Sequence, residues 1–437
     1  MAGGGNWETQ NKELSGAYTN FKTNSLAVAG LDSKGAVAIP LMLDWGKVGE
    51  FIKVSLTTKF KEVFGKDLKD LLPIKEAFKG TGNVIVYNLN GEGEKAAATS
   101  GEFKVSAAHG GVGGNKLSVT IAIGLSGNAT VRTFFEGVRV DSQIVEKTEE
   151  LKANAYVIFE GTLPEVDAIL TLTGGTTLAA QNDSYATFAA GLDTQIFKTI
   201  ALGSDDESVK LMLSLKVKQW RENEGKNVAL ITNDYNAADH EGVISIKNGV
   251  YLGGEFLPAK DAVYWYGAAY ANAGSNSLTY EEYPGATDVE RLDHDAIVKA
   301  KREGHVVFIY DQGEDGIDRM VVESDINTFR SFTPEKNRDF GKGLIVRQMD
   351  IMGNNIKHVY SRSYIGKVKN GGNGRNLFKG AIMKEVLDRM VRRGEIEPYN
   401  PDDIVVIVGD EKDAVLVSLG VKFIDAMEKL YTTVDCQ

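Results

Sequence analysis

The sequence predicts an α+β protein with several domains. Three observations lead to this fold class: a length of 437 residues, short alternating β segments between about residues 95 and 173, and helices alternating with strands between about residues 185 and 322. A chain of this length exceeds one ordinary hydrophobic core. We expect an N-terminal arm, a small N-terminal α/β domain, a β-sandwich-like domain, an α/β domain, a C-terminal α+β domain and a C-terminal arm, at residues 1–30, 31–93, 94–178, 179–328, 329–423 and 424–437.

The first folded segment mixes a helix with a strand. Apolar residues at helical spacing predict a helix within residues 54–72, and the run Asn-Val-Ile-Val-Tyr-Asn-Leu predicts a strand at 83–89. The periodic apolar positions are Phe60, Val63, Phe64, Leu68 and Leu71.

The second segment consists of short β runs separated by Gly-rich turns. Residues 116–123 alternate polar and apolar side chains with a period of two, which is typical of a half-buried strand. Further runs at 130–135, 137–144 and 155–160 complete the pattern of a β-sandwich or small barrel.

The third segment alternates helix and strand. Helices are expected at 209–223, 262–273 and 289–303, and buried strands at 228–231 and 306–309. Repeated helix-then-strand order indicates a partly parallel sheet.

The C-terminal segment contains a basic amphipathic helix. A polar helix at 340–360 and a Gly-rich loop at 371–374 precede it, and the helix itself is expected over 376–393. Its apolar stripe consists of Phe378, Ile382, Val386 and Met390. Its basic side chains are Lys379, Lys384, Arg389, Arg392 and Arg393, which is a local reversal of sign in an acidic chain.

Composition restricts the classes of function. The formal net charge of −11 has the wrong sign for a general nucleic-acid binder. The single cysteine, Cys436, excludes a disulfide framework within one chain. The N-terminal residues lack the features of a signal peptide, and no apolar run is long enough to span a bilayer. We therefore expect synthesis in a reducing bacterial cytoplasm and no direct contact with a membrane or with nucleic acid.

The sequence does not predict a catalytic, cofactor or metal site. The Gly-rich run at 110–116 precedes a strand, whereas a phosphate-binding loop precedes a helix. None of the five histidines has metal-ligand spacing, and Asp293, His294 and Asp295 are adjacent residues that do not share one helix face. An α/β hydrolase-like enzyme stays an alternative, because a Ser/His/Asp triad assembles only in space.

Several motifs, spread over nearly the whole chain, resemble those of the contractile tail sheath proteins of phages and phage-tail-like particles. The likeness is greatest to the sheaths of defective prophages and R-type bacteriocins of Gram-positive bacteria. The motifs stand at 3–7 (Gly-Gly-Gly-Asn-Trp), 16–21 (Gly-Ala-Tyr-Thr-Asn-Phe), 113–119 (Gly-Gly-Asn-Lys-Leu-Ser-Val), 239–246 (Asp-His-Glu-Gly-Val-Ile-Ser-Ile), 267–271 (Gly-Ala-Ala-Tyr-Ala), 277–280 (Ser-Leu-Thr-Tyr), 323–329 (Glu-Ser-Asp-Ile-Asn-Thr-Phe) and 425–431 (Asp-Ala-Met-Glu-Lys-Leu-Tyr).

The resemblance implies a structural protein and not an enzyme. It implies a subtilisin-like α/β domain without a catalytic triad, and terminal segments that add strands to sheets of neighbouring subunits. The implied partners are other copies of the chain in a helical polymer of stacked rings, expected to be hexameric, and the tail tube, baseplate and tail-terminator proteins. The basic helix would face the tube. No cofactor is implied, and the particle would be a virion tail or an extracellular phage-tail-like particle.

The residues of the two ends agree with such arms. Residues 414–423 alternate like a half-buried strand, and 427–434 form a second β run with no later partner in the chain. The alternative is an ordinary hairpin in which this tail folds back. The expected arm residues are Trp7, Tyr18, Phe21, Val417, Leu419, Val421, Phe423, Met427, Leu430 and Tyr431.

The expected function is mechanical. Subunits would assemble around a tube in an extended lattice and pass into a shorter and wider one, with hinges at residues 23–30 and 409–413. Two alternatives stay open: the sheath of a related secretion or injection system, and the hydrolase-like enzyme.

Overall fold

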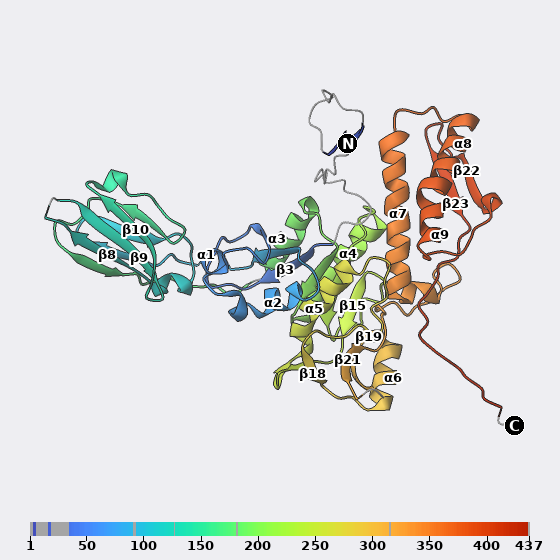
Figure 1. Cartoon of the computed structure of the whole chain (residues 1–437), viewed down its shortest axis with the longest axis horizontal. Helices are drawn as coiled ribbons and strands as arrows, with labels where there is room; N and C mark the ends of the chain where they lie inside the picture. Colours follow the sequence, from blue (N-terminus) through green and yellow to red (C-terminus); the bar gives the residue numbers. More distant parts are fainter. Residues whose placement is uncertain are drawn as a thin grey trace. The chain divides into compact units, whose positions relative to one another are not determined.

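The computed structural model describes residues 3–5, 16–18, 35–90, 93–125, 127–180, 182–313 and 316–435 (Figure 1). The chain divides into two compact units, residues 1–33 and 34–437. In the first unit β1 (Gly3–Gly5) pairs in parallel with β2 (Gly16–Tyr18), which places Gly5 opposite Tyr18. Trp7, Phe21 and the proposed hinge at 23–30 lie outside the described residues.

The main sheet of the second unit contains seven strands among the described residues, in the order β19-β15-β14-β13-β3-β5-β4. Its strands run parallel except β4, which is antiparallel to β5. The strands are β3 (Val37–Leu41), β4 (Phe51–Val54), β5 (Val84–Asn88), β13 (Thr199–Leu202), β14 (Ala229–Asn233), β15 (Val243–Ile246) and β19 (His305–Val306).

Helices cover both faces of this sheet, so β3, β5, β13, β14 and β15 are buried along their whole length and rich in apolar residues. Alternate residues of β13 separate into two cores: Ala201 belongs to one, and Ile200 and Leu202 belong to the other. The first core includes side chains of α1 (Phe60–Phe64), α2 (Leu72–Phe78) and α5 (Ala259–Asn272). The second includes side chains of α3 (Asn182–Gly191) and α4 (Glu207–Glu222).

The prediction of a separate N-terminal α/β domain over residues 31–93 is wrong. Strand β3 pairs with both β5 and β13, so this segment is the continuation of the large sheet. Periodicity along the chain cannot reveal this arrangement, because Val37 pairs with Thr199, which is far away in sequence. The likeness of the sheet region to subtilisin stays a prediction.

The helix predicted within residues 54–72 is also interrupted. α1 ends at Gly65, whose φ of 68° is left-handed and whose N–H donates to the Lys61 carbonyl. A Cβ at Gly65 would lie 2.8 Å from the Cβ of Trp45, so this position requires glycine. A 3₁₀ turn, Leu68–Asp70, leads from there to α2.

Residues 97–172 form two antiparallel sheets around a shared apolar core. The sheet orders are β10-β9-β8-β12 and β11-β7-β6. The strands are β6 (Ala97–Ser100), β7 (Phe103–Ala107), β8 (Leu117–Ile123), β9 (Ala129–Phe135), β10 (Val138–Val145), β11 (Val157–Glu160) and β12 (Ala168–Thr171), with 3₁₀ turns at Val112–Lys116 and Thr148–Glu150. The side chains of Phe103, Leu117 and Phe135 are fully buried between the sheets.

Smaller elements surround one end of the large sheet. They are β16 (Val250–Leu252), β17 (Glu255–Leu257), β18 (Ala286–Val289), α6 (His294–Glu303), β20 (Phe308–Gln312), β21 (Asp318–Val322) and a 3₁₀ turn at Leu192–Thr194. α6 begins later than the sequence predicts, because the Asp293 carboxylate accepts the N–H of Ala296 at 2.7 Å and caps the helix there.

The C-terminal region packs helices against a β-hairpin (Figure 1). Its elements are a 3₁₀ turn (Arg338–Gly341), α7 (Gly343–Ser363), α8 (Gly372–Ala381), a π-helical turn (Ile382–Leu387), α9 (Asp388–Arg392), a 3₁₀ turn (Pro401–Asp403), β22 (Ile404–Val408) and β23 (Val415–Leu419). The core of this region contains Met352 and Val359 of α7 and Ile404 of β22. It also contains apolar residues of the helical segment 372–392, which lies between α7 and β22 in the chain.

A buried ion pair joins the large sheet region to α7. Arg347 of α7 lies 2.6 Å from the Asp325 carboxylate, and both side chains are almost fully buried. Arg347 also donates to the carbonyls of Gly274 and Asn276 beyond the end of α5. These contacts satisfy both charges, which burial of an ion pair requires.

Candidate interaction surfaces

The basic helix has the apolar stripe that the sequence predicts. α8, the π-helical turn and α9 follow one another without a break over residues 372–392. Phe378, Ile382, Val386 and Met390 are all buried against α7 and the hairpin. Leu387 is fully buried as well.

The basic side chains of this helix lie away from the apolar stripe that packs against α7 and the hairpin. Lys384, Arg389, Arg392 and Arg393 are exposed, and Lys379 is half-buried. Arg393 lies 3.9 Å from the Glu395 carboxylate. A surface of this kind can bind an acidic partner through charge, and the assignment of these five residues to a tube contact stays a prediction.

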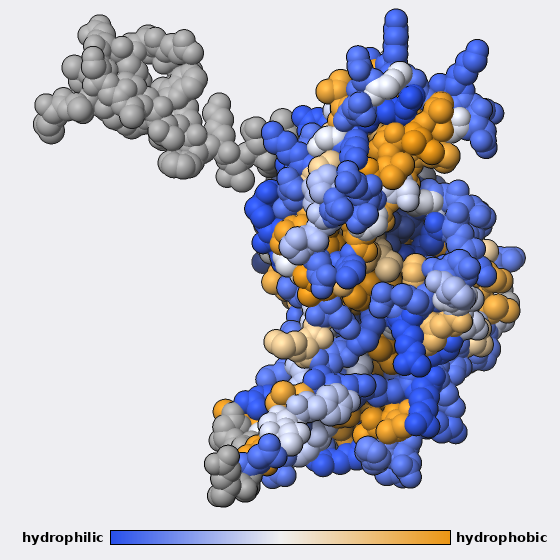
Figure 2. Space-filling view, turned by 90° about the vertical axis from the view of Figure 1, so that its right-hand side faces the viewer, coloured by the Kyte–Doolittle hydropathy of each residue, from blue (hydrophilic) through white to orange (hydrophobic). Residues whose placement is uncertain are grey.

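The hairpin β22–β23 has one face without a cover. Its register places Ile407 opposite Leu416 and Val406 opposite Val417. Ile404 packs into the local core, whereas Ile407 and Leu416 are 51% and 54% exposed. Figure 2 views the side of the molecule on which Figure 1 labels β22 and β23, and it shows a group of apolar side chains near the top. Within the described part of the chain no further strand pairs with β22 or β23.

The structure places four predicted arm residues in this region and not in a free arm. Val417 and Leu419 pair with β22 of the same chain, so the alternation of 414–423 reflects an internal hairpin. Val421 packs against the local core, and Phe423 bridges to Ile396. Their placement in the arm is therefore wrong. Whether this hairpin also receives a strand from a neighbour stays a prediction.

The last described residues, 424–435, form the C-terminal arm. They contain no helix or strand, and Figure 1 shows them as a single extended trace. The apolar side chains of Met427, Leu430 and Tyr431 are 103%, 90% and 88% exposed. Among the described residues no strand pairs with the β run predicted at 427–434, which has no regular structure. Of the N-terminal arm residues, only Tyr18 lies in a described strand.

A Ser/His/Asp arrangement, which the sequence did not reveal, occurs within the large sheet. The Oγ of Ser245 lies 2.8 Å from Nδ1 of His305, and Nε2 of His305 lies 3.9 Å from the Asp234 carboxylate. Ser245 is fully buried, and its Oγ also accepts the N–H of Tyr235 at 2.7 Å. Burial lowers the pKa of His305. Because no substrate can reach a fully buried hydroxyl, this cluster links β15 to β19 and does not form a nucleophile.

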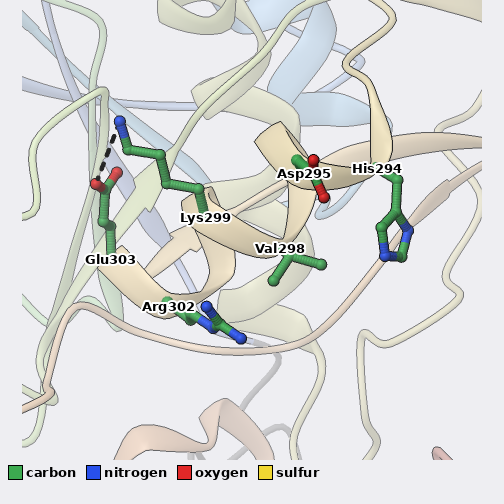
Figure 3. Close-up of a pocket in the computed structure, with 6 residues that line it drawn as sticks. All are labelled: His294, Asp295, Val298, Lys299, Arg302 and Glu303. Carbon is green, nitrogen blue, oxygen red and sulfur yellow. Dashed lines mark ion pairs between the residues drawn. The ribbon is translucent and has the colours of Figure 1, made fainter.

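The hollow along α6 does not bring together side chains from different elements, as a catalytic site would. It measures about 580 Å³, and its lining residues all belong to one helix: His294, Asp295, Val298, Lys299, Arg302 and Glu303 (Figure 3). Lys299 and Glu303 form an ion pair of 3.9 Å along the helix. The described residues contain no cluster of His, Cys, Asp and Glu that could hold a metal ion.

A second hollow, of about 490 Å³, lies where the end of α7 meets the start of α8 and the hairpin turn. Tyr364 and Phe378 line its apolar part, and Lys369, Arg375 and Lys412 supply positive charge. In the described parts of the chain no helix is both long and apolar enough to cross a membrane.

Comparisons with known proteins identify the family of this chain. A model of the phage tail sheath protein central domain matches residues 179–328, and a model of the phage tail sheath C-terminal domain matches residues 335–437. In Bacillus subtilis (strain 168), protein YqbK is 33% identical over 470 residues and covers 100% of both chains. The phage-like element PBSX protein XkdK of the same organism is 33% identical over 468 residues, with 99% of each chain covered.

Solved structures give the same result. The crystal structure of the sheath tail protein from Desulfitobacterium hafniense superposes on this chain with a TM-score of 0.82 and 33% sequence identity. The match covers 96% of this chain and 99% of the other.

Proposed function

The chain belongs to the phage tail sheath family, and on this premise we propose that it polymerises as a helix around an inner tail tube and contracts to drive that tube through a bacterial envelope. The family is structural, so the protein is a tail sheath component and not an enzyme. Self-assembly and association with tail and baseplate components follow from family membership.

Two features of one chain support the proposal: an exposed, extended C-terminal segment, which we assign as a strand donor, and a hairpin with unpaired edges, which we assign as the acceptor. The donor is the C-terminal arm, in which Leu430 and Tyr431 are exposed. The acceptor is the hairpin β22–β23, which has an exposed apolar face and no further strand at its edges among the described residues. Unpaired edges of this kind are templates for strand addition from another chain.

Such an exchange would contribute favourable free energy to assembly. A strand added along the five residues of β22 or β23 makes about five backbone hydrogen bonds, worth roughly 5 kcal/mol net. Burial of Leu430 and Tyr431 adds roughly 1.5–3 kcal/mol each. Because donor and acceptor are different surfaces, the contact is head-to-tail, which generates rings or helical polymers.

Electron microscopy and sedimentation of the purified full chain test the proposal. The full chain should form rings or tubes, whereas a variant without residues 425–437 should stay monomeric. A full chain that stays monomeric at every concentration, or a shortened chain that forms the same tubes, would contradict strand exchange.

The basic helix supplies the proposed contact with the tube. Lys384, Arg389 and Arg392 are exposed on the side of the helix away from its core. Replacing all three by Glu should abolish binding to an acidic tube at low salt, because opposite charges then become like charges. Tube-free polymers should still form. The matched control reverses three exposed lysines of the β-sandwich region, Lys104, Lys147 and Lys152, and should bind the tube normally.

Contraction would proceed by rotation of the globular parts while the arms keep neighbours connected. The hinge expected at residues 409–413 is not retained, because these residues lie in the turn between β22 and β23, whose strands pair with each other. Two polymer forms of different length, seen by electron microscopy before and after a trigger, would support this step. A single form under all conditions would contradict it.

A further inference from the structure

The root of the C-terminal arm is fastened to its own chain by polar contacts. The N–H of Ile424 donates to the Glu395 carbonyl at 3.0 Å, and Nε2 of Gln348 donates to the Ile424 carbonyl at 3.3 Å. Beyond this point Asp425 lies 3.2 Å from Nζ of Lys342. Glu428 pairs with the same Lys342.

Glu428 has a second partner, because its carboxylate accepts the hydroxyl of Thr279 at 2.9 Å. We call Thr279, Lys342, Asp425 and Glu428 the arm clamp. The side chains of Lys342 and Glu428 are only 28% and 15% exposed. Burial lowers the pKa of Lys342, but the hydrogen bond that Lys342 donates to Glu428 and the charges of Glu428 and Asp425 more than offset this effect, and the net shift of the pKa is upward. The clamp is therefore a partly shielded, charge-assisted contact.

The clamp is attached to the junction between the sheet region and α7, next to the buried ion pair of Asp325 and Arg347. The hydroxyl of Thr279 accepts the N–H of Asp325 at 2.9 Å, and Asp325 is the buried partner of Arg347. Lys342 bridges to Ile326 and stands directly before α7. The root of the arm is thus tied to a fixed point and not to a flexible loop.

The apolar side chains of the arm take no part in the clamp and stay exposed to solvent. Asp425 and Glu428 bind the parent chain, whereas Met427, Leu430 and Tyr431 lie almost fully in solvent. A tail that simply collapsed on its own surface would show the reverse, with apolar side chains covered and carboxylates in water. The parent chain therefore holds the root of the arm and leaves its apolar tip for another surface.

We propose that the arm clamp positions the C-terminal arm as an already extended strand for a second copy of the chain. This inference rests on the strand exchange proposed above, and it assigns Thr279, Lys342 and Glu428 as positioning residues for that exchange. A free segment loses conformational freedom when it binds, and holding its root in the bound conformation reduces that loss.

The test combines hydrogen exchange with assembly. In Lys342→Met and Glu428→Gln, the backbone amide of Ile424, which is hydrogen-bonded to Glu395, should exchange faster in the monomer, and the critical concentration for polymerisation should rise at least about tenfold. The critical concentration of the double variant should be no higher than that of the more strongly affected single variant, because both changes break the same contact. The control is Lys422→Met, which removes an equal charge from an exposed lysine that stands just before the arm.

The possible failures are distinguishable. If the full chain polymerises and needs its arm, but both clamp variants polymerise at the wild-type concentration, the clamp inference is wrong and strand exchange stands. If the control weakens assembly as much as the clamp variants do, charge near the arm is responsible and the clamp inference is again wrong. If the wild-type chain never polymerises, both proposals are lost.

Discussion

The large sheet and the C-terminal hairpin use similar residues in opposite ways. Val, Ile and Leu dominate both, yet Ile231 of β14 is fully buried whereas Ile407 of β22 is half exposed. The large sheet has helices on both faces, and the hairpin has them on one face only. The comparison shows that the first region completes its own core, and that the second presents β structure that another chain can complete.

The largest effect on folding is expected at the junction between these regions. Asp325→Ala leaves the buried guanidinium of Arg347 without its carboxylate, which should lower the free energy of unfolding by about 3–5 kcal/mol. Urea unfolding followed by circular dichroism measures this loss. In the double variant Asp325→Leu with Arg347→Met most of the stability should return, since neither charge is then buried. A loss below about 1 kcal/mol in Asp325→Ala would show that water reaches the pair.

A deletion in the large sheet should have the next largest effect. Ile231→Ala removes a fully buried side chain that packs with α5, and it should cost about 2–5 kcal/mol. The matched variant Ile407→Ala on the outer face of the hairpin should cost much less. Equal losses at the two positions would mean that the hairpin face is covered within the monomer in solution.

Local periodicity predicts the helices of this chain better than it predicts their partners. The four-residue spacing of Phe378, Ile382, Val386 and Met390 encodes one buried face directly. Pairing of β3 with β13 connects residues more than a hundred positions apart, and the local sequence of neither strand identifies the other as its partner. The same limit explains why the cluster of Ser245 and His305 could not be foreseen.

The arms were only partly predictable for a related reason. Alternation in residues 414–423 correctly indicates a strand, but alternation cannot say whether the partner strand belongs to the same chain. The arm clamp did have a signal: Asp425 and Glu428 alternate with apolar residues that stay exposed. Their common partner, Lys342, is identified only by the fold.

Acid should weaken the sheet region through its buried histidines. Burial lowers the pKa of His240 and of His305 below the ordinary value of 6.5, so the folded state keeps both rings neutral. The unfolded chain takes up these protons first, and stability therefore falls as the pH drops below 6.5 towards the folded pKa values. Urea midpoints measured between pH 8 and pH 5 should decrease. The decrease should be smaller in His305→Asn, and an unchanged slope in that variant would contradict the assignment.

The smallest effect on folding is expected on the outer face of the hairpin. Ile407→Ser with Leu416→Ser changes two side chains that already lie half in water, so the free energy of unfolding should fall by only about 1–2 kcal/mol. Assembly should nevertheless fail or need a much higher concentration. The reason is that the arm of a neighbouring copy loses the apolar surface on which its side chains would be buried. Urea unfolding of the monomer measures the free energy of unfolding, and microscopy of the polymer measures assembly. If the double variant unfolds readily, the outer face of the hairpin is part of the core of the monomer. If the variant polymerises normally, the apolar face does not contribute to binding and only the edges of the hairpin accept the strand.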